Sequence, residues 1–393
     1  MKNQLSPTTI KIGILGGGQL GKMLYQAASP WALDVHILDR SKTFPAARVC
    51  PSFHIGDFTD YDDVLTFGRQ MDLITIEIES VNVEALLQLE REGVMVYPQP
   101  SILNIINDKG LQKTFYQDNH LPTAAFTLVK NQAEILDQIT SGKIEFPFVQ
   151  KSRKGGYDGR GVQVIHNEAS LHKIMDVPSV IEERVSIEKE IGLILARNPS
   201  GEIKAYTPVE MVFDPEANLV DHLIAPAQIS LDYSEELNRI GTRLVEEMDI
   251  VGLLAVEFFI DTKGEIFINE MAPRTHNSGH HTIEACPCSQ FEQQFRAILD
   301  FPLGDTTQEK SYAAMINILG PESFTGPPSY PNLRNTLSMK DVFPHIYGKS
   351  ISKPNRKMGH ITLIANDRPT LIQKINTIKS QFYIQPIHMF KNL

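Results

Sequence analysis

The first hundred residues alternate between short apolar runs and longer amphipathic segments. The apolar runs have the length of buried strands, and in the segments between them apolar side chains recur every three or four residues, as on one face of a helix. This order predicts a parallel sheet with helices on both faces, which is a Rossmann-like α/β domain. The predicted strands are Lys11–Leu15, Val35–Asp39, Leu73–Ile78 and Val94–Tyr97, and the predicted helices are Leu20–Ala28, Tyr61–Arg69 and Val83–Glu92.

The pattern changes after Pro100. An amphipathic helical segment extends to Pro122, and the apolar runs beyond it are longer and follow one another directly, as in an antiparallel α+β domain. The clearest elements of this block are a helix at Glu235–Glu247, a hairpin that joins Leu253–Ile260 to Glu265–Met271, and a helix at Gln290–Leu299.

The last ninety residues begin with the Pro/Gly-rich stretch "LGPESFTGPPSYPN" and continue in short strands without long helices. They predict a small β-rich module. Three domains are therefore expected: a Rossmann-like domain over residues 1–105, an α+β domain over 106–303 and a β-rich domain over 304–393.

Composition narrows the class of protein. The net charge is −10 and the basic residues are dispersed, which disfavours a groove that follows a nucleic acid backbone. The N-terminus lacks the apolar region of a secretion signal, and no window is apolar enough to span a membrane. Three cysteines suit a reducing cytoplasm; Cys286 and Cys288 would fit a redox or metal pair, but small thiols beside a core are the more common case.

A glycine motif follows the first predicted strand. Gly16, Gly18 and Gly21 form G-x-G-x-x-G between a strand and a helix, and Asp39 ends the next strand. This is the dinucleotide-binding fingerprint, in which the pyrophosphate lies on the helix N-terminus. Taken alone, the motif favours an NAD enzyme.

A second glycine-rich loop lies between two predicted antiparallel strands. Lys151 ends the first strand, and the loop "GGYDGRG" carries four glycines between Gly155 and Gly161. Glycines at this density let backbone N–H groups approach an anion, so the loop would cover ATP phosphates, although it is not a Walker A sequence. The alternative is an ordinary surface hairpin.

The segment "VIEERVSIEKE" offers the groups that a nucleoside needs. The end of a strand at Glu182–Val185 supplies backbone donors and acceptors for adenine, and Glu190 supplies a carboxylate for ribose. A solvated, charged strand would have the same composition.

Two acids lie in the predicted hairpin. If Asp261 pairs with Gly264, Glu257 faces Ile268, and Glu270 becomes its diagonal neighbour at about 5.5–8 Å. Two carboxylates on one face of an apolar hairpin are costly unless a cation lies between them, and Mg²⁺ takes such oxygen ligands. Two separately solvated acids are the alternative.

Directly after the hairpin comes "MAPRTHNSGHHT", a loop that is dense in hydrogen-bond donors. His276 and His281 would be possible metal ligands, but their spacing does not argue for zinc. Donors to an anionic substrate fit better. The side chains concerned are Arg274, His276, Asn277, Ser278, His280 and His281.

Together these motifs resemble the ATP-grasp superfamily and, within it, the 5-(carboxyamino)imidazole ribonucleotide synthase family of purine biosynthesis. The resemblance covers nearly the whole chain and is carried by "GGGQLG", "GGYDGRG", "NEMAPRTHNSGH" and "YGK…NRKMGH". It implies an ATP-grasp fold and a ligase that uses ATP and bicarbonate, through carboxyphosphate, to carboxylate 5-aminoimidazole ribonucleotide. It also implies Mg²⁺ or Mn²⁺ and a homodimer. In this family the first glycine turn lines the ribonucleotide site and binds no dinucleotide.

The resemblance also assigns site residues. Phe213 stands where some members carry His, and Glu79 competes with Glu77 for a substrate role. The ATP-binding set is Lys109, Lys151, Gly156, Tyr157, Asp158, Gly159, Arg160, Gly161, Val162, Glu182, Glu183, Arg184, Val185, Glu190, Phe213, Asn269 and Glu270. The catalytic set is Arg274, His276, Asn277 and Asp158; the substrate set is Gln19, Glu77, Arg160, Ser278, Lys349 and Arg356; the metal ligands are Glu257 and Glu270.

Three other functions share parts of this pattern. A formate-dependent glycinamide ribonucleotide transformylase and a biotin carboxylase share the acyl-phosphate chemistry, but "RTHNSGHHT" and "GGGQLG" favour the first family. An NAD-dependent dehydrogenase would need neither the paired acids nor a second glycine loop.

Overall fold

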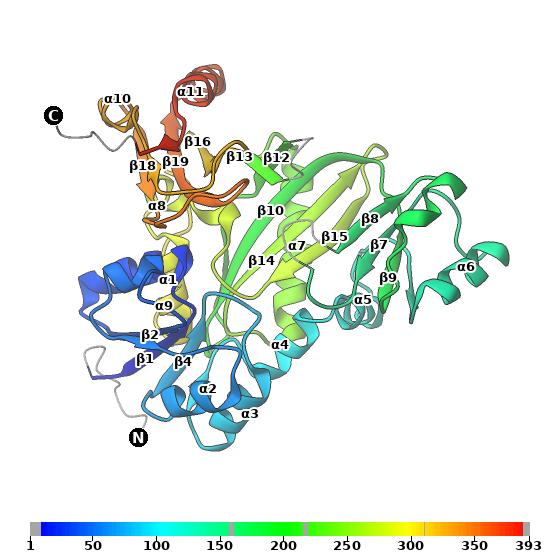
Figure 1. Ribbon diagram of the computed structural model, residues 1–393, viewed down its shortest axis with the longest axis horizontal. Coiled ribbons are helices and arrows are strands. Elements are labelled where there is room, and N and C mark those ends of the chain that lie inside the picture. Colours follow the sequence, from blue (N-terminus) through cyan, green and yellow to red (C-terminus); the bar gives the residue numbers. More distant parts are fainter. Residues whose placement is uncertain (1–8, 157–160, 215–218, 310, 388–393) are drawn as a thin grey trace.

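The computed structural model describes residues 9–156, 161–214, 219–309 and 311–387. Its N-terminal part is a parallel sheet in the order β3-β2-β1-β4-β5, with helices on both faces (Figure 1), so the predicted Rossmann-like architecture is confirmed. The strands are β1 (Lys11–Leu15), β2 (Asp34–Asp39), β3 (Phe53–Ile55), β4 (Leu73–Ile76) and β5 (Met95–Val96); the helices are α1 (Gln19–Ala28), α2 (Tyr61–Gly68) and α3 (Val83–Arg91), with 3-10 turns η1 (Ser29–Trp31) and η2 (Pro45–Arg48).

Two details of this sheet differ from the prediction. Strand β3 was missed because it is very short and partly exposed, so it lacks the apolar pattern of its neighbours. Strand β4 ends at Ile76, two residues earlier than predicted, so Glu77 and Glu79 lie in the connection that leaves its carboxyl end. In parallel sheets that edge is where ligands bind.

The helical segment after Pro100 is two helices, α4 (Pro100–Ile106) and α5 (Lys109–Asp118). The chain breaks at Asn107 and Asp108 because the Asp108 carboxylate accepts hydrogen bonds from the N–H groups of Gly110 and Leu111 and so begins a new helix. This break makes Lys109 the first residue of α5, and its side chain reaches Glu270 of β15.

The central part contains two antiparallel sheets. A four-stranded sheet in the order β6-β9-β7-β8 carries the second glycine loop between β7 and β8, and α6 packs beside it. Its elements are β6 (Phe126–Val129), α6 (Gln132–Thr140), β7 (Phe148–Ser152), β8 (Val162–Ile165), η3 (Glu168–Lys173) and β9 (Ser179–Glu183).

The larger sheet runs β15-β14-β10-β12-β13-β16-β19-β18, with β11 paired to β10. Helix α7 packs on β10 over the largest apolar cluster. The elements are β10 (Ile187–Arg197), β11 (Ile203–Ala205), β12 (Val209–Asp214), β13 (Leu219–Ala225), α7 (Leu231–Met248), β14 (Gly252–Asp261), β15 (Ile266–Ala272), η4 (Asn277–Gly279), α8 (Thr282–Ala285) and α9 (Gln290–Ile298).

In the C-terminal segment β17 and β20 pair with each other as a small two-stranded sheet, whereas the longer strands join the large sheet. Strands β16, β19 and β18 continue the large sheet, because β16 pairs with β13. The expectation of a module without long helices was wrong, since α11 covers these strands (Figure 1). The elements are β16 (Tyr312–Leu319), β17 (Pro328–Ser329), α10 (Leu333–Leu337), β18 (Val342–Ile346), β19 (Lys357–Ala365), α11 (Arg368–Gln381) and β20 (Gln385–Pro386).

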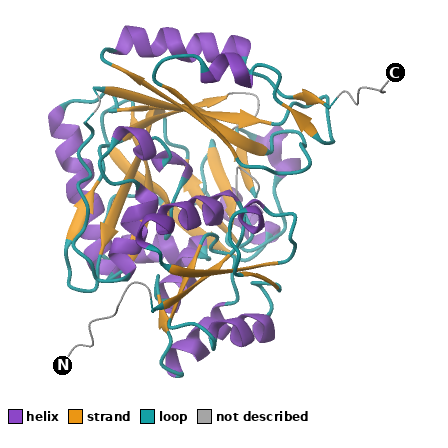
Figure 2. Ribbon diagram, turned by 90° about the vertical axis from the view of Figure 1, so that its left-hand side faces the viewer, coloured by secondary structure: helices purple, strands orange, loops and turns teal. Residues whose placement is uncertain are grey.

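Helix α9 joins the parallel sheet domain to the large sheet. It contacts α1 on one side and β14 on the other, and Phe291 and Phe295 are buried in one cluster with Ile14 and Leu24. In Figure 2, helices lie between the parallel sheet, in the lower part of the view, and the strands above it. Within the described part of the chain, every helix is too short or too polar to cross a membrane.

Candidate active site

The two hairpin acids lie directly opposite each other. Glu257 on β14 pairs with Glu270 on β15, whereas Phe258 pairs with Ile268, so Asn269 is the extra residue of a β-bulge. The predicted pairing of Glu257 with Ile268 was therefore wrong. The turn has three residues, closed by Asp261 and Glu265 with Gly264 at φ +84°, and this turn together with the bulge brings the acids closer than the predicted diagonal.

The electrostatics of this pair call for a cation. Burial, together with Glu270 and Glu190, raises the pKa of Glu257 above the usual range of a carboxyl. Burial also disfavours the charged form of Glu270, but Lys109 donates to it at 2.7 Å and holds its pKa below the usual range. Glu270 is 46% exposed and Glu257 only 16%, so Glu270 is open to a ligand from solvent while Glu257 lies deeper.

A buried charge cluster lies beneath Lys109. The Lys151 ammonium donates to Asn269 Oδ1 and lies 2.9 Å from the Glu182 carboxylate, which is 3.1 Å from Lys113 on its other side. The Glu182 carboxylate thus fixes two lysines inside the protein. The adenine role predicted for this end of β9 concerns its backbone and stays a prediction.

Lys113 was missed by the sequence analysis. It follows Lys109 by four residues and therefore lies on the same face of α5, which is the signal that would have found it. Burial, reinforced by Lys151, lowers the pKa of Lys113 to about 8 although Glu182 opposes the shift. Asp108 and Arg153 were also missed; they form a two-pronged ion pair at 2.8 Å at the base of the glycine loop.

Other predicted ATP-site residues surround this cluster. Gly161 has φ +75° and accepts a hydrogen bond from the Ser152 N–H, so it closes the described end of the glycine loop. Burial raises the pKa of Glu190 to about 7. Glu183 ends β9, Arg184 and Val185 connect β9 to β10, Val162 begins β8, and Phe213 on β12 packs beside a buried cluster. The predicted residues Tyr157, Asp158, Gly159 and Arg160 lie outside the described residues.

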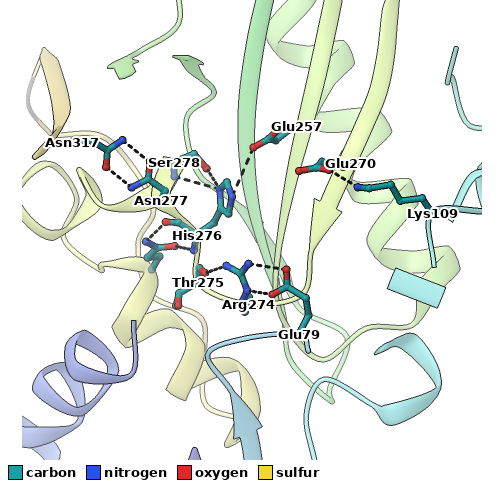
Figure 3. Close-up of polar contacts among 11 residues, drawn as sticks. Glu79, Lys109, Glu257, Glu270, Arg274, Thr275, His276, Asn277, Ser278 and Asn317 are labelled. Atoms are coloured by element: carbon teal, nitrogen blue, oxygen red, sulfur yellow. Dashed lines mark hydrogen bonds and ion pairs between the residues drawn. The ribbon is translucent and has the colours of Figure 1, made fainter. Parts of the chain in front are cut away.

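Arg274 is held by an acid in the connection that follows β4 of the parallel sheet. Its guanidinium makes a bidentate contact with Glu79, through Nε and through Nη2 at 2.9 Å (Figure 3). Burial would raise the pKa of Glu79, but Arg274 outweighs it and lowers the pKa to about 2. Glu79 therefore orients Arg274 and stays ionised.

Glu77 has a different partner. Its carboxylate accepts hydrogen bonds from the N–H groups of Gly18 at 2.9 Å and Gly21 at 3.0 Å, at the N-terminus of α1. Asp39 similarly accepts from the Gly17 N–H at 2.7 Å. The donors that would hold a pyrophosphate are thus occupied by the chain's own acids, which argues against a dinucleotide. Gln19 begins α1 next to this turn, and the substrate contacts of Gln19 and Glu77 stay predictions.

His276 points toward the acids from the loop after β15 (Figure 3). Its Nε2 lies 3.7 Å from Glu257, and its Nδ1 accepts a hydrogen bond from the Ser278 N–H, so the neutral ring carries its proton on Nε2. Burial, with Arg274 and Lys357 nearby, lowers the pKa of His276 to about 4. The ring is therefore a neutral donor at physiological pH.

The rest of the donor loop divides into two groups. Asn277 is partly exposed and exchanges hydrogen bonds with Asn317 of β16 at 3.0 and 3.1 Å. Ser278, His280 and His281 are buried, and their role as donors to a substrate stays a prediction. Ser278 supports His276 from behind, with its hydroxyl 2.9 Å from Nδ1.

The two predicted basic side chains of the C-terminal segment donate to carbonyl groups of that segment, which also contacts basic side chains of the N-terminal domain. Lys349 donates to the Lys357 carbonyl and Arg356 to the Ile351 carbonyl, while Lys22 of α1 donates to the Ile346 carbonyl at 2.9 Å. Arg48 lies beside Gly348, which has φ +86°. Lys22 and Arg48, which the sequence analysis missed, therefore lie next to the segment that leads into Lys349.

Comparison with known proteins covers most of the chain. Residues 9–107 match the ribonucleotide synthetase preATP-grasp domain, 114–291 the ATP-grasp domain, and 313–374 the phosphoribosylaminoimidazole carboxylase C-terminal domain. An N5-carboxyaminoimidazole ribonucleotide synthase from Synechococcus elongatus is 35% identical over 357 residues, which is 90% of this chain and 89% of that protein.

Solved structures agree with this match. The N5-carboxyaminoimidazole ribonucleotide synthetase of Thermotoga maritima has 39% identity and a TM-score of 0.88, covering 96% of this chain and 99% of that one. The Aspergillus clavatus enzyme, solved with ADP and 5-aminoimidazole ribonucleotide, has 28% identity and a TM-score of 0.84, covering 95% and 99%. The chain therefore belongs to the N5-carboxyaminoimidazole ribonucleotide synthase family, ATP-grasp ligases of purine biosynthesis that act on 5-aminoimidazole ribonucleotide, ATP and bicarbonate.

Proposed function

We propose that the site formed by the Glu257–Glu270 pair and the Arg274–Asn277 loop carboxylates 5-aminoimidazole ribonucleotide by way of carboxyphosphate. A bicarbonate oxygen attacks the γ-phosphorus of ATP and ADP leaves. The ribonucleotide's exocyclic amine then forms a C–N bond to the carboxyl carbon, directly or through CO₂, while phosphate leaves and the amine loses a proton. The observation that carries the proposal is that a lysine-paired acid pair, His276 and a guanidinium fixed by Glu79 lie side by side (Figure 3).

Binding of the ATP phosphates is assigned to Lys109 and Lys151. Their ammonium groups flank Glu270 and Asn269, so they would neutralise phosphate charge next to the acids. The nucleotide itself is proposed by analogy with the relative solved with ADP. The loop Gly156–Gly161 would cover the phosphates, and Glu190 would meet the ribose.

A divalent cation, Mg²⁺ or Mn²⁺, fits Glu257 and Glu270. No group of three or more His, Cys, Asp or Glu side chains able to hold a metal occurs in the described ranges. A site with two carboxylates suits Mg²⁺, which usually keeps waters and binds substrate phosphates as its other ligands. When bound, the cation would supply charge neutralisation at the phosphates.

The bicarbonate end is assigned to Arg274 and His276. Arg274 is already oriented by Glu79, and a rigid guanidinium fork matches the planar anion. His276 would donate from Nε2 to an oxygen that gains charge as carboxyphosphate forms. Asn277 would add an amide donor.

The ribonucleotide phosphate is assigned to Lys349 and Arg356, with Lys22 and Arg48 nearby. A phosphate monoester carries close to two negative charges, and the guanidinium and ammonium groups supply charge-assisted donors. Ser278 would support His276 through the contact of its hydroxyl with Nδ1, and its substrate contact stays a prediction. We also propose that the protein is a homodimer, that it is cytoplasmic, and that its domains meet at residues 105 and 303.

The test measures phosphate release together with ribonucleotide carboxylation. We expect full ATP turnover only when both 5-aminoimidazole ribonucleotide and bicarbonate are present, with one labelled carbon fixed per ADP formed. Turnover that is indifferent to bicarbonate, or that proceeds with formate in its place, would remove the proposal and favour another acyl-phosphate ligase.

A further inference from the structure

We propose that Gln290, to which no substrate contact is assigned, is a positioning residue that aims the His276 ring toward Glu257 and Glu270. Gln290 is the first residue of α9 and is fully buried. The inference rests on the proposed role of His276 and adds the element that holds it.

The Gln290 amide binds both main-chain groups of His276. Its Oε1 accepts from the His276 N–H at 2.9 Å, and its Nε2 donates to the His276 carbonyl at 2.7 Å. His276 has extended backbone, with φ −132° and ψ 158°, at the point where the chain leaves β15 and before η4 begins. Gln290 therefore supplies the pair of hydrogen bonds that a neighbouring strand would supply.

The same amide is fixed on its other side. Its Nε2 also lies 3.1 Å from Nδ1 of the buried His280, and the Gln290 N–H donates to Thr282 Oγ1 at 2.9 Å. Gly279 leaves the space for this arrangement, because a Cβ there would lie 2.5 Å from Gln290 Oε1. The amide is thus held by several contacts and has little freedom to turn.

A glutamine suits this position better than an acid of the same shape. A carboxylate would still accept from the His276 N–H, but its second oxygen would face the His276 carbonyl and the ring nitrogen of His280. It would also place a charge where the side chain is fully buried. The donor half of the amide is therefore the feature to test.

The chain provides a matched control on the same helix. Gln293 is also fully buried, and its amide accepts from the Gly304 N–H at 2.7 Å and donates to the Gly304 carbonyl at 3.3 Å. It makes the same kind of main-chain clamp one turn away, on a segment that does not carry His276. Gln290→Glu and Gln293→Glu therefore differ in which segment they disturb.

We expect Gln290→Glu to lower kcat by about ten- to a hundredfold, because a small misplacement of a catalytic group has effects of this size. The affinity for ADP should stay the same, and kcat is taken per ADP-binding site so that unfolded protein does not count. Gln293→Glu should keep the wild-type kcat. If Gln290→Glu yields no folded protein, Gln290→Met, which removes both hydrogen bonds without adding charge, serves for the same comparison.

A double-mutant cycle separates this inference from the role of His276. If Gln290 acts through His276, Gln290→Glu should cost nothing more in a His276→Ala background. Full additivity, an unchanged kcat in Gln290→Glu, or an equal loss in Gln293→Glu would each overturn the inference. An active His276→Ala variant would instead overturn the proposed role of His276.

Discussion

At the scale of single residues, the site consists of pairs of side chains whose charges repel or attract each other. Glu257 and Glu270 face each other across two strands, Lys109 relieves Glu270, and Glu79 holds Arg274. Each pair predicts a different consequence when one partner is removed.

Glu270→Ala should lower turnover by about a hundredfold or more, since it would remove a ligand of the proposed cation at the phosphates. The fold should survive, because the substitution relieves the repulsion on Glu257. Circular dichroism and kcat at saturating Mg²⁺ check this, with Glu265→Ala, an exposed acid of the same hairpin, as control. Retention of more than about a tenth of the activity would remove Glu270 from the metal site.

Arg274→Lys should lower kcat/KM for bicarbonate by about tenfold or more, because an ammonium cannot keep the two-pronged contact with Glu79 and also present a planar fork to the anion. Steady-state kinetics with varied bicarbonate measure the effect. Equal activity of the Arg and Lys proteins would show that charge alone suffices.

Lys113 gives a prediction for stability against pH. Its pKa is lowered from 10.5 to about 8 in the folded protein, so between these values the unfolded chain binds more protons. The free energy of unfolding should therefore rise with pH through this window relative to Lys113→Met, in which the effect is absent. Urea unfolding near both ends of the window measures it, and the exposed Lys173→Met is the control. A pH-independent difference would contradict the shift.

At the scale of elements, the order of strands and helices in the first hundred residues followed from the hydrophobic pattern. The hairpin was predicted too, but its register was not. The register depends on the bulge at Asn269, and the hydrophobic pattern of the two strands does not reveal a bulge. Helix α11 was missed although Asp367 caps it, Pro369 lies in its first turn, and Leu371, Ile375 and Ile378 form its buried face. Its interrupted apolar pattern resembles that of short strands. The helix becomes evident only from its packing against β16 and β19.

The C-terminal strands give the test at this scale. Arg356→Ala should lower kcat/KM for the ribonucleotide by about ten- to a hundredfold, since a charge-assisted contact is worth roughly 1.5–3 kcal/mol. The KM for ATP should not change, because the proposed site for the ATP phosphates is at Lys109 and Lys151. Arg334→Ala, on the exposed helix α10, is the control. A raised KM for ATP with an unchanged ribonucleotide KM would contradict the assignment.

At the scale of the whole molecule, the site exists because segments far apart in the sequence meet. Glu79 reaches Arg274 from the parallel sheet, Lys22 reaches the strand before Lys349, and α9 packs between the two sheets. The residue types of the site were predictable from motifs. Their partners Lys113, Lys22, Arg48 and Gln290 were not, because a sequence pattern does not state which distant side chains will be neighbours.

The same scale resolves the first glycine motif. Glu77 and Asp39 occupy the N–H groups at the start of α1, so calorimetric titration should detect binding of ATP with Mg²⁺ and none of NADH. NADH binding without ATP binding would return the motif to its usual role.

The most direct measurement of the central claim follows an oxygen atom. When bicarbonate labelled with heavy oxygen is supplied with ATP and 5-aminoimidazole ribonucleotide, a carboxyphosphate intermediate transfers one bicarbonate oxygen to the phosphate that is released. We therefore predict one labelled oxygen in each phosphate, by mass spectrometry, and loss of phosphate release in Glu270→Ala. Release of unlabelled phosphate while the ribonucleotide is carboxylated would contradict a carboxyphosphate intermediate. Phosphate release at the wild-type rate in Glu270→Ala would contradict the role of Glu270.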